Sequence, residues 1–220
     1  MARTRSRDYD SIQDSILDKT AELFAARGYV ASSISDIADA CQCSKSRLYH
    51  YFESKETILI AILRRHVDKL LQGAREIVAE TADPTERFGE LIRFFMEIYA
   101  VSRSKHVVLL TCMEFLPDAH RREIIDKQRE LISHVRNVLK AILPDTAKAG
   151  LSNIDTMLFF GMINWTYTWY RPDGPMQPHA LADRCVDIFL NGYRATAGEG
   201  NTRAEAAPPR KRTASLKKAG

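Results

Sequence analysis

The stretch SISDIADACQCSKSRLYHYFESKE, residues 33–56, brings two short helical segments, two cysteines and a group of cationic and aromatic residues together in the chain. Ser33 followed by Asp36 has the pattern of a capping box, which predicts a short helix over 34–40. Ser44 can cap a second helix that ends near Tyr51. Two short helices joined by a turn of about three residues can pack on a third helix and present the second one to the major groove of DNA.

The residues of this stretch divide into an apolar set and a polar set. The apolar set would form a small core with the helix before it, and comprises Ile34, Ile37, Ala38, Leu48 and Phe52. The polar set surrounds the second short helix and supplies donors suited to DNA phosphates and base edges, namely Ser44, Lys45, Ser46, Arg47, Tyr49, His50 and Tyr51. This division favours a helix that is held against DNA.

The segment Cys41-Gln42-Cys43 allows a second interpretation, a metal or redox pair. Two cysteines make only half of a zinc site, and no second Cys or His cluster follows nearby in the sequence. Cys112 and Cys185 are distant, and the irregular spacing of the four cysteines forms no disulfide framework. Packing in the turn is the interpretation that the residues favour, so we expect neither a metal site nor a cofactor.

Composition and charge limit the class of protein. The chain is 45% hydrophobic and 27% charged, which is typical of a soluble globular protein. No apolar run reaches the roughly 18 residues that cross a membrane, and MARTRSRDYD leads into no signal-peptide core, so we expect a cytoplasmic protein without a membrane partner. Residues 1–55 hold eight basic and eight acidic residues, and 56–194 hold eighteen of each. Any case for nucleic acid therefore depends on where the charges lie.

Apolar residues recur with a helical period along most of the chain. Gly28 follows the first such segment as a C-terminal cap, Asp83 and Pro84 open another, and Pro144 ends a third. No alternating pattern indicates a strand, so we predict an all-α fold. The expected helices span 12–27, 34–40, 45–51, 55–78, 84–99, 105–115, 118–142, 152–170 and 178–193.

We expect three parts in the chain. Residues 1–55 would form a helix-turn-helix DNA-binding domain, and 56–194 a larger domain for ligand binding and dimerisation. Residues 195–220 lack almost all large apolar side chains and are rich in Lys and Arg, which predicts a disordered basic tail. Three arginines precede the first expected helix, namely Arg3, Arg5 and Arg7. They would form either a basic arm that reaches DNA or an ordinary solvated terminus.

The segment from Gly28 and Tyr29 through residue 56 resembles the DNA-binding domain of the TetR family of transcriptional regulators. The resemblance implies a homodimer whose two heads bind a palindromic double-stranded operator. It also implies a second domain whose cavity binds a small molecule that releases the DNA. The matching residues are Asp36, Ile37, Ala38, Ser44, Lys45, Leu48, Tyr49, His50, Tyr51, Phe52, Ser54, Lys55 and Glu56.

This resemblance implies two kinds of DNA contact. Base edges would be contacted by Lys45, Ser46 and Tyr49. Phosphates would be held by Ser33, Ser44, Arg47, His50, Tyr51 and Lys55. The sequence departs from the family where Gln42 occupies the usual turn glycine, and where Ser46 and Arg47 replace the common Gly and Thr. A left-handed backbone at Gln42 would cost about 1 kcal/mol, and the other two replacements leave the operator sequence open.

The segment expected to be helical over 152–170 is apolar on nearly every side, which predicts burial within the domain or against a second subunit. Asn164 lies among these apolar residues and needs a hydrogen-bond partner, either a ligand or a neighbouring helix. Aromatic residues of this segment and of earlier helices would either fill the core or line a ligand cavity. With Asn164, the candidates for the cavity are Phe95, Tyr99, Phe115, Trp165 and Trp169.

The sequence FFGMINWTYTWYRPDGP, residues 159–175, is similar to the corresponding segment of TetR-family repressors that respond to acyl-CoA thioesters. Those repressors control fatty-acid, phenylacetate or sterol-ring degradation. The similarity implies an apolar cavity for the acyl group, with cationic side chains at its mouth for the CoA phosphates. Arg171 is the candidate for such a cation.

We therefore predict a homodimeric TetR-like repressor that is released from its operator by a small hydrophobic effector, such as an acyl-CoA thioester. The last two expected helices would pair with those of a second subunit in a four-helix bundle. The alternative is a multidrug- or redox-responsive regulator of the same fold, which would use the aromatic pocket or Cys41 and Cys43. An enzyme is not expected, because no nucleophile, metal cluster or Gly-rich phosphate loop occurs in the sequence.

Overall fold

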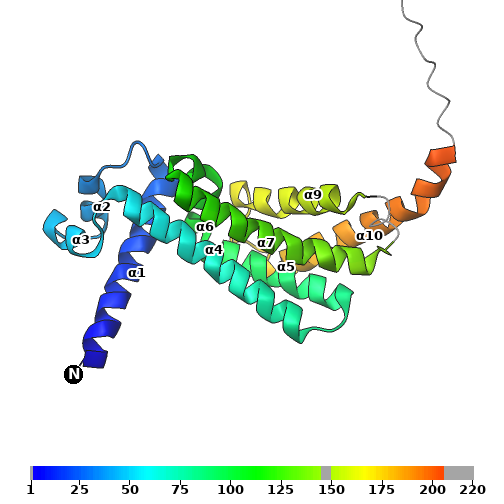
Figure 1. Ribbon diagram of the computed structural model, residues 1–220, viewed down its shortest axis with the longest axis horizontal. Helices are drawn as coiled ribbons and strands as arrows, with labels where there is room; N and C mark the ends of the chain where they lie inside the picture. Colours follow the sequence, from blue (N-terminus) through cyan, green and yellow to red (C-terminus); the bar gives the residue numbers. More distant parts are fainter. Residues whose placement is uncertain (1, 145–149, 206–220) are drawn as a thin grey trace, which may run out of the picture.

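Helices make up nearly all of the fold (Figure 1). The computed structural model describes residues 2–144 and 150–205, with side chains over 9–144 and 150–192. No strand occurs in these ranges, which confirms the predicted all-α class. In chain order the described helices are α1 (Ala2–Arg27), α2 (Ile34–Ala40), α3 (Lys45–Tyr51), α4 (Lys55–Glu80), α5 (Pro84–Val101), α6 (Arg103–Thr111), α7 (Asp118–Ile142), α9 (Ser152–Asn164) and α10 (Pro178–Glu205), with 3₁₀ helices at Met113–Phe115 and Trp165–Thr168.

Helices α2, α3 and α4 begin at the serine caps that the sequence predicts. Ser33 Oγ accepts a hydrogen bond from the backbone N–H of Asp36 at 3.2 Å, and the Asp36 carboxylate accepts one from the backbone of Ser33 at 2.7 Å. The Ser44 side chain accepts from the N–H of Arg47 at 3.1 Å and begins α3. Ser54 caps α4 through a second capping box. These caps satisfy N–H groups that a helix leaves unpaired in its first turn.

The chain is helical over two segments where the sequence indicated otherwise. Helix α1 begins at Ala2, so the backbone of the three N-terminal arginines belongs to the helix and does not precede it as an arm. Their side chains lie outside those described. Helix α10 continues through 195–205, a segment that its composition assigned to a disordered tail. The rest of that predicted tail, 206–220, lies outside the described residues.

Helix α9 ends earlier than its apolar pattern predicts. It stops at Asn164, and Trp165–Thr168 forms a 3₁₀ turn. The hydroxyl of Thr166 donates to the carbonyl of Ile163 at 2.6 Å, and the hydroxyl of Thr168 donates to the carbonyl of Trp165 at 2.8 Å. Side-chain bonds of this kind compete with the continuing helical ladder. The helix therefore tightens and ends here.

The buried residues form two apolar clusters. The head cluster joins α1, α2 and α3 to the first half of α4, to α6 and to the start of α7; it includes Leu17, Phe24, Ile37, Ala38, Leu48, Phe52, Leu59, Leu63, Val67, Val108, Cys112, Leu116 and Ile124. The body cluster joins the second half of α4 to α5, α7, α9 and α10; it includes Leu70, Ala74, Phe88, Phe95, Tyr99, Leu131, Val135, Phe159, Ile163, Leu181 and Leu190.

The two clusters show that α4 belongs to both parts of the molecule. The boundary expected between residues 55 and 56 coincides with the start of one continuous helix, and residues from α6 and α7 complete the core under α1–α3. The small core predicted around the two short helices is confirmed, because Ile37, Ala38, Leu48 and Phe52 are buried. Ile34 is partly buried against the same cluster.

Figure 1 shows α2 and α3 at one end of the molecule, with α4 extending from them toward the other helices. Helix α7 packs on α4, α5 and α9, and α10 packs on α5. The short helices are thus carried at one end of a larger helical body. None of the helices in the described ranges is long and apolar enough to cross a membrane.

The backbone conformation of Gln42 indicates a substitution that should stabilise the folded protein. Gln42 has φ +54°, the left-handed conformation expected for the turn position that glycine usually occupies. This conformation costs a residue with a side chain about 1–2 kcal/mol, and a glycine at this position would remove that cost. Glycine loses more chain entropy on folding, which offsets about 0.5–1 kcal/mol of the stability gained. We expect Gln42→Gly to raise the free energy of unfolding by about 0.5–1 kcal/mol in urea titrations at fixed protein concentration. Gln42→Ala is the control, and an equal effect of both substitutions would contradict the explanation.

Candidate DNA-binding surface and effector cavity

Helix α3 presents most of its predicted DNA contacts to solvent. Leu48 is fully buried in the head cluster and fixes the orientation of the helix. On the other faces the side chains are accessible, and Tyr49 keeps 51% of its surface exposed. The loop that joins α2 to α3 ends at Ser44, which caps α3. The first helical turn of α3 lies at the surface and carries the cations Lys45 and Arg47. The exposed residues are Ser44, Lys45, Ser46, Arg47, Tyr49 and His50.

Two of the predicted phosphate contacts already have partners within the chain. Ser33 is exposed, but its hydroxyl lies 2.5 Å from the Asp36 carboxylate in the cap of α2. Tyr51 is half-buried, and its ring centroid lies 4.6 Å from that of Tyr9 on α1. The neighbouring His50 also approaches both tyrosine rings edge-on. These contacts hold the C-terminal end of α3 against α1.

The ammonium group of Lys55 stabilises the loop between α1 and α2. Its Nζ donates hydrogen bonds of 2.9 Å to the backbone carbonyls of Tyr29 and Ser32, and it lies 4.2 Å from the centroid of the Tyr29 ring. A lysine has three N–H donors, so one remains for a phosphate. The sequence pattern predicted the phosphate contact but not this bracing of the loop, which depends on the tertiary fold.

Cys41 and Cys43 lie half-buried in the turn and pack against the head cluster. Burial raises the pKa of the Cys41 thiol to about 11, and the neighbouring Cys43 contributes to the increase. The reactive thiolate is therefore scarce at neutral pH. Among the residues the structure describes, no three His, Cys, Asp or Glu side chains are grouped so as to hold a metal ion. The packing interpretation is supported, and a redox sensor at this position is disfavoured.

A cavity of about 310 Å³ lies where α4, α5, α6, α7 and α9 meet, and it borders both apolar clusters. At about 30 Å³ for each non-hydrogen atom, as for a water molecule, it holds a group of about ten atoms. Exposed lining residues mark its opening, because Leu110, Arg129 and Met157 all contact solvent. Most of the remaining lining is apolar and consists of Val67, Leu70, Leu109, Ile125, Leu131, Ile132 and Phe160.

Polar groups gather at the buried side of the cavity. The Tyr99 hydroxyl donates to Asn164 Oδ1 at 3.0 Å, and the ring centroid of His106 lies 3.6 Å from that of Tyr99. His66 Nε2 on α4 lies 3.3 Å from His106 Nδ1 on α6. These four residues, which we call the polar cluster, connect α4, α5, α6 and α9. Three of them line the cavity, and His66 lies behind His106.

Burial keeps the polar cluster uncharged. Desolvation, helped by the nearby Lys105 and Lys69, lowers the pKa of His66 to about 4. Desolvation, helped by His66, lowers the pKa of His106 to about 3. Burial also raises the pKa of Tyr99. At neutral pH both imidazoles are neutral and the phenol is protonated, so this side of the cavity offers hydrogen bonds without an ion.

Tyr99 and Asn164, both candidates from the sequence, line the cavity. Asn164 also accepts a hydrogen bond from Tyr99 on a neighbouring helix, which is one of the two roles expected for it, and its contact with a ligand stays a prediction. Sequence reasoning missed His106, because it directly follows Arg103, Ser104 and Lys105 and nothing in that pattern marks it as buried. The candidates that lie outside the lining are Phe95, Phe115, Trp165, Trp169 and Arg171.

The aromatic candidates outside the lining fall into three environments. Phe95 is fully buried in the body cluster. Phe115 stacks on Tyr29 with 5.1 Å between ring centroids, under the loop that follows α1. Trp165 and Trp169 are 64% and 57% exposed, because α9 ends before them and the 3₁₀ turn carries them to the surface. Apolar periodicity does not distinguish these environments, since core, cavity and interface all require apolar side chains.

The cation at the cavity is Arg129 and not Arg171. Arg171 is exposed in the loop between α9 and α10 and lies outside the lining. Arg129 on α7 is exposed, lines the opening, and forms an ion pair with Asp126 at 2.9 Å. Arg129 carries no signal in the sequence, because a charged pair on one face of a long helix is typical of an ordinary solvated surface.

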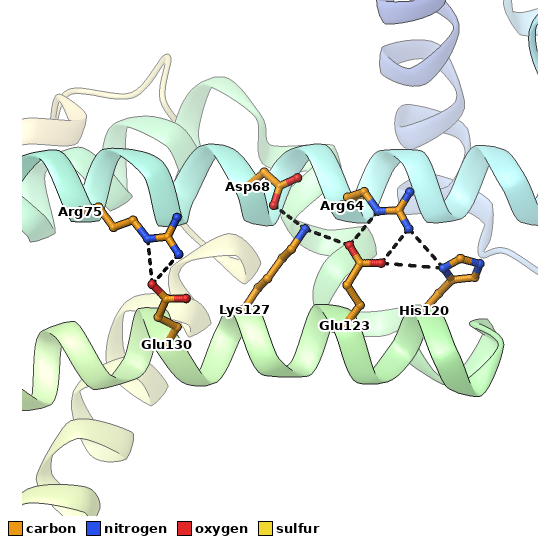
Figure 2. A network of polar contacts seen from close by, with 7 residues as sticks. All are labelled: Arg64, Asp68, Arg75, His120, Glu123, Lys127 and Glu130. Atoms are coloured by element: carbon orange, nitrogen blue, oxygen red, sulfur yellow. Dashed lines mark hydrogen bonds and ion pairs between the residues drawn. The ribbon is translucent and has the colours of Figure 1, made fainter.

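Ion pairs join α4 to α7 beside the cavity (Figure 2). Arg64 forms a bidentate pair with Glu123, with N–O distances of 2.9 and 2.7 Å. Lys127 bridges Glu123 at 2.9 Å and Asp68 at 2.6 Å. Hydrogen bonds from Arg64 and Lys127 lower the pKa of Glu123 to about 2. Farther along the same two helices, a second pair is formed by Arg75 and Glu130.

Helix α6 links the cavity to the DNA-binding end. Lys105 forms an ion pair with Asp18 on α1. The next residue, His106, lines the cavity, as do Leu109 and Leu110 one turn further. A group that enters the cavity therefore contacts a helix that is fastened directly to α1.

A helix-turn-helix head on a helical body with its own cavity defines a ligand-responsive DNA-binding regulator. Residues 16–62 match a family model described as bacterial regulatory proteins, tetR family, and 81–193 match one described as tetracyclin repressor-like, C-terminal domain. The second match alone spans just over half of the chain. The chain belongs to the TetR family of transcriptional regulators, which are not enzymes, and the predicted class of ligand-responsive helix-turn-helix repressor is confirmed.

Individual relatives agree with this assignment. The chain is 32% identical to the HTH-type transcriptional repressor KstR2 of Rhodococcus jostii (strain RHA1), over 80% of this chain and 88% of that protein. A TetR-family transcriptional regulator from Bordetella parapertussis 12822 has a similar structure, with a TM-score of 0.80, 52% identity, and coverage of 84% of this chain and 96% of that one. The complex of AibR with isovaleryl coenzyme A and operator DNA gives a TM-score of 0.68 at 26% identity, and covers 80% and 97% of the two chains.

The buried histidine pair predicts a loss of stability in mild acid. Unfolded histidines bind protons near pH 6.5, whereas His66 and His106 resist protonation to about pH 4 and about pH 3. Below about pH 6.5 the unfolded state binds more protons, so the free energy of unfolding falls as the pH falls. We expect each histidine to lower the free energy of unfolding by up to about 1.4 kcal/mol for each pH unit of acidification between pH ~6 and ~4.5. Urea unfolding at a series of pH values measures this slope.

The matched control for this measurement is an exposed histidine. The double variant His66→Asn, His106→Asn should lose most of the slope, whereas His179→Asn, at an exposed position, should keep it. Equal slopes in the double variant and the wild type would show that other groups cause the acid sensitivity.

Proposed function

We propose that this chain is a cytoplasmic homodimeric repressor that binds a palindromic operator through α3 and is released by an acyl-CoA thioester. The observation that carries the proposal is the cavity, which has apolar walls, room for about ten non-hydrogen atoms and the exposed guanidinium of Arg129 at its opening. An acyl group has the size and polarity of the interior. The large anionic CoA portion would stay outside, where its phosphates meet Arg129.

A relative supports this class of effector. The AibR structure contains isovaleryl coenzyme A together with operator DNA. An isovaleryl group is small enough to enter a cavity of this volume.

The exposed side chains of α3 support the proposed DNA contacts. Lys45, Ser46 and Tyr49 lie on exposed positions of the helix and would contact base edges in the major groove. The remaining contacts would go to phosphates. Those at Tyr51 and Lys55 would use donors that their contacts within the chain leave, and Ser33, whose hydroxyl donates to Asp36, would turn that O–H to the phosphate. The proposed phosphate contacts are Ser33, Ser44, Arg47, His50, Tyr51 and Lys55.

An exposed apolar stripe on α9 supports the homodimer. Ile154 and Leu158 lie one turn apart on α9, and Trp165 lies about two turns further along, in the 3₁₀ turn that follows the helix; they are 59%, 65% and 64% exposed. On α10, Ile188 is 54% exposed. A single chain leaves these side chains in water, and contiguous exposed apolar surface marks an interaction site. We propose that α9 and α10 pair with those of a second copy across a twofold axis.

The helices around the cavity provide the route for release. An acyl group would contact α4, α6 and α7, and α6 is ion-paired to α1 through Lys105 and Asp18. Displacement of α4 and α6 would change the distance between the two copies of α3. Each copy must reach a major groove about one helical turn from the other, so the change would lower operator affinity.

The effector proposal is tested by fluorescence anisotropy on DNA from upstream of the gene that encodes the chain. We expect tight binding without effector, and a loss of at least about tenfold in affinity with a saturating acyl-CoA thioester, the usual scale of allosteric coupling. Free acids and CoA alone should have much weaker effects, because each supplies only one of the two ends that the cavity recognises. Release by free acids as readily as by thioesters would contradict the role of CoA.

Variants separate the two sites in this experiment. Arg129→Gln should raise the thioester concentration needed for release without changing DNA affinity, and Arg122→Gln is the matched control, because Arg122 is exposed on α7 outside the cavity. Lys45→Ala or Tyr49→Phe should weaken specific binding by about 1–3 kcal/mol for each lost base contact.

If α9 and α10 form the dimer interface, a charged side chain inserted there should make the protein a monomer. Leu158→Asp would place a carboxylate in the apolar interface, so sedimentation velocity at micromolar concentration should show a monomer while the wild type remains a dimer. Val30→Asp is the control, because Val30 is 74% exposed in the loop between α1 and α2 and lies on neither α9 nor α10. A dimer that survives Leu158→Asp would place the interface elsewhere.

A further inference from the structure

One nitrogen of the polar cluster has no hydrogen-bond partner in the described part of the chain. This atom, Nε2 of His106, is buried, while Nδ1 on the other edge of the ring contacts His66. Asn164 lies close enough to His106 to oppose the fall of its pKa, yet it makes no bond of good geometry with Nε2. A buried polar atom without a partner costs about 1–3 kcal/mol, so its presence calls for a physical explanation.

The unpaired atom belongs to the wall of the cavity. His106 and Asn164 line it from α6 and α9, and Tyr99 lines it from α5. The Tyr99 hydroxyl donates to Asn164 Oδ1, which orients the amide so that its NH₂ group points away from Tyr99. Tyr99 and His106 on this side are buried and Asn164 is partly buried, whereas Arg129 marks the opening. The cavity thus has a cationic open end and an uncharged polar end, and the rest of its lining is apolar except for Gln128 on α7.

The charge of each end restricts what can bind there. A carboxylate at the polar end would be desolvated without a cation, since both histidines are held neutral. A plain alkyl group would leave His106 Nε2 unpaired. An uncharged oxygen, by contrast, accepts a hydrogen bond from the Asn164 amide or from a histidine N–H, and a hydroxyl can also donate one.

We propose that the polar end of the cavity selects acyl groups that carry a keto or hydroxyl oxygen at the end remote from the thioester, with Asn164 and His106 as its hydrogen-bond partners. This inference rests on the acyl-CoA effector proposed above and narrows it to oxygenated acyl groups. A ring or chain of about ten non-hydrogen atoms spans the cavity, with its thioester toward the opening and its remote oxygen at Asn164.

Two pairs of probes test the inference and the effector proposal separately. The first pair is methyl cyclohexylacetate and methyl 4-oxocyclohexylacetate, whose binding to the full-length protein is measured by ligand-detected NMR. The second pair is the corresponding CoA thioesters, measured by release of operator DNA. In both pairs we expect the oxo compound to act at about tenfold lower concentration, the upper range for one neutral hydrogen bond.

Each outcome of the two measurements is decisive. If the oxo ester binds more tightly but neither thioester releases DNA, the polar end is selective and the acyl-CoA effector is wrong. If both thioesters release DNA at equal concentration, the effector proposal stands and the selectivity is wrong. Equal binding of the two esters, or no binding of either, overturns the selectivity as well.

Variants assign the selectivity to the named side chains. Asn164→Leu and His106→Leu should reduce the oxo preference to about twofold or less, and His106→Gln, which keeps a donor and an acceptor, should retain part of it. Leu110→Ala is the matched control, because Leu110 lines the opening and should lower the affinity of both probes without changing their ratio. The ratio is insensitive to a general loss of stability, and Asn164→Leu supplies the test if His106→Leu does not fold. A preference that survives both Leu variants would contradict the assignment.

Discussion

The rest of the structure depends on the burial of one helix, α4, along its whole length. Its first half packs in the head cluster and its second half in the body cluster, without a break between Lys55 and Glu80. Each buried Leu or Ile contributes about 1.5–3 kcal/mol. Bending α4 would therefore disturb two cores at once. The orientation of the DNA-binding end relative to the body is set by apolar packing on a single rigid element.

The cavity lies where the two clusters meet, and this position explains its chemistry. Packing of α4 passes from one core to the other between Val67 and Leu70, and His66 lies at this junction. The ion pairs of α4 with α7 flank it at the surface, where such pairs contribute about 0–1 kcal/mol each. They tolerate a small displacement of the helices at little cost. The dense apolar packing on either side does not, so the junction is the natural place for a ligand to act.

How much the sequence could predict depended on how local the determining interactions are. The caps at Ser33, Ser44 and Ser54 involve residues a few positions apart, and all three were predictable. The left-handed turn at Gln42 was implied only by the resemblance to a family that has glycine there. The cavity was not, because a stripe of apolar residues shows which side of a helix faces inward and not whether the space there is filled. Arg129 and His106 could be recognised only once three helices were placed around them. Trp165 has the hydrophobicity of a core residue, and its exposure follows from the early end of α9.

The head cluster has a consequence for how such regulators diversify. Its core is completed by Val108 of α6, by Cys112 and Leu116 of the connection that follows α6, and by Ile124 of α7, none of which belongs to the first three helices. The DNA-reading part is thus not a cassette that can be cut at residue 55 and joined to another body. A hybrid regulator would keep the operator specificity of this chain only if it contained α6 and the start of α7 together with α1, α2 and α3. New effector specificities should accordingly arise by point changes on α9 and the later turns of α7, which the head does not use.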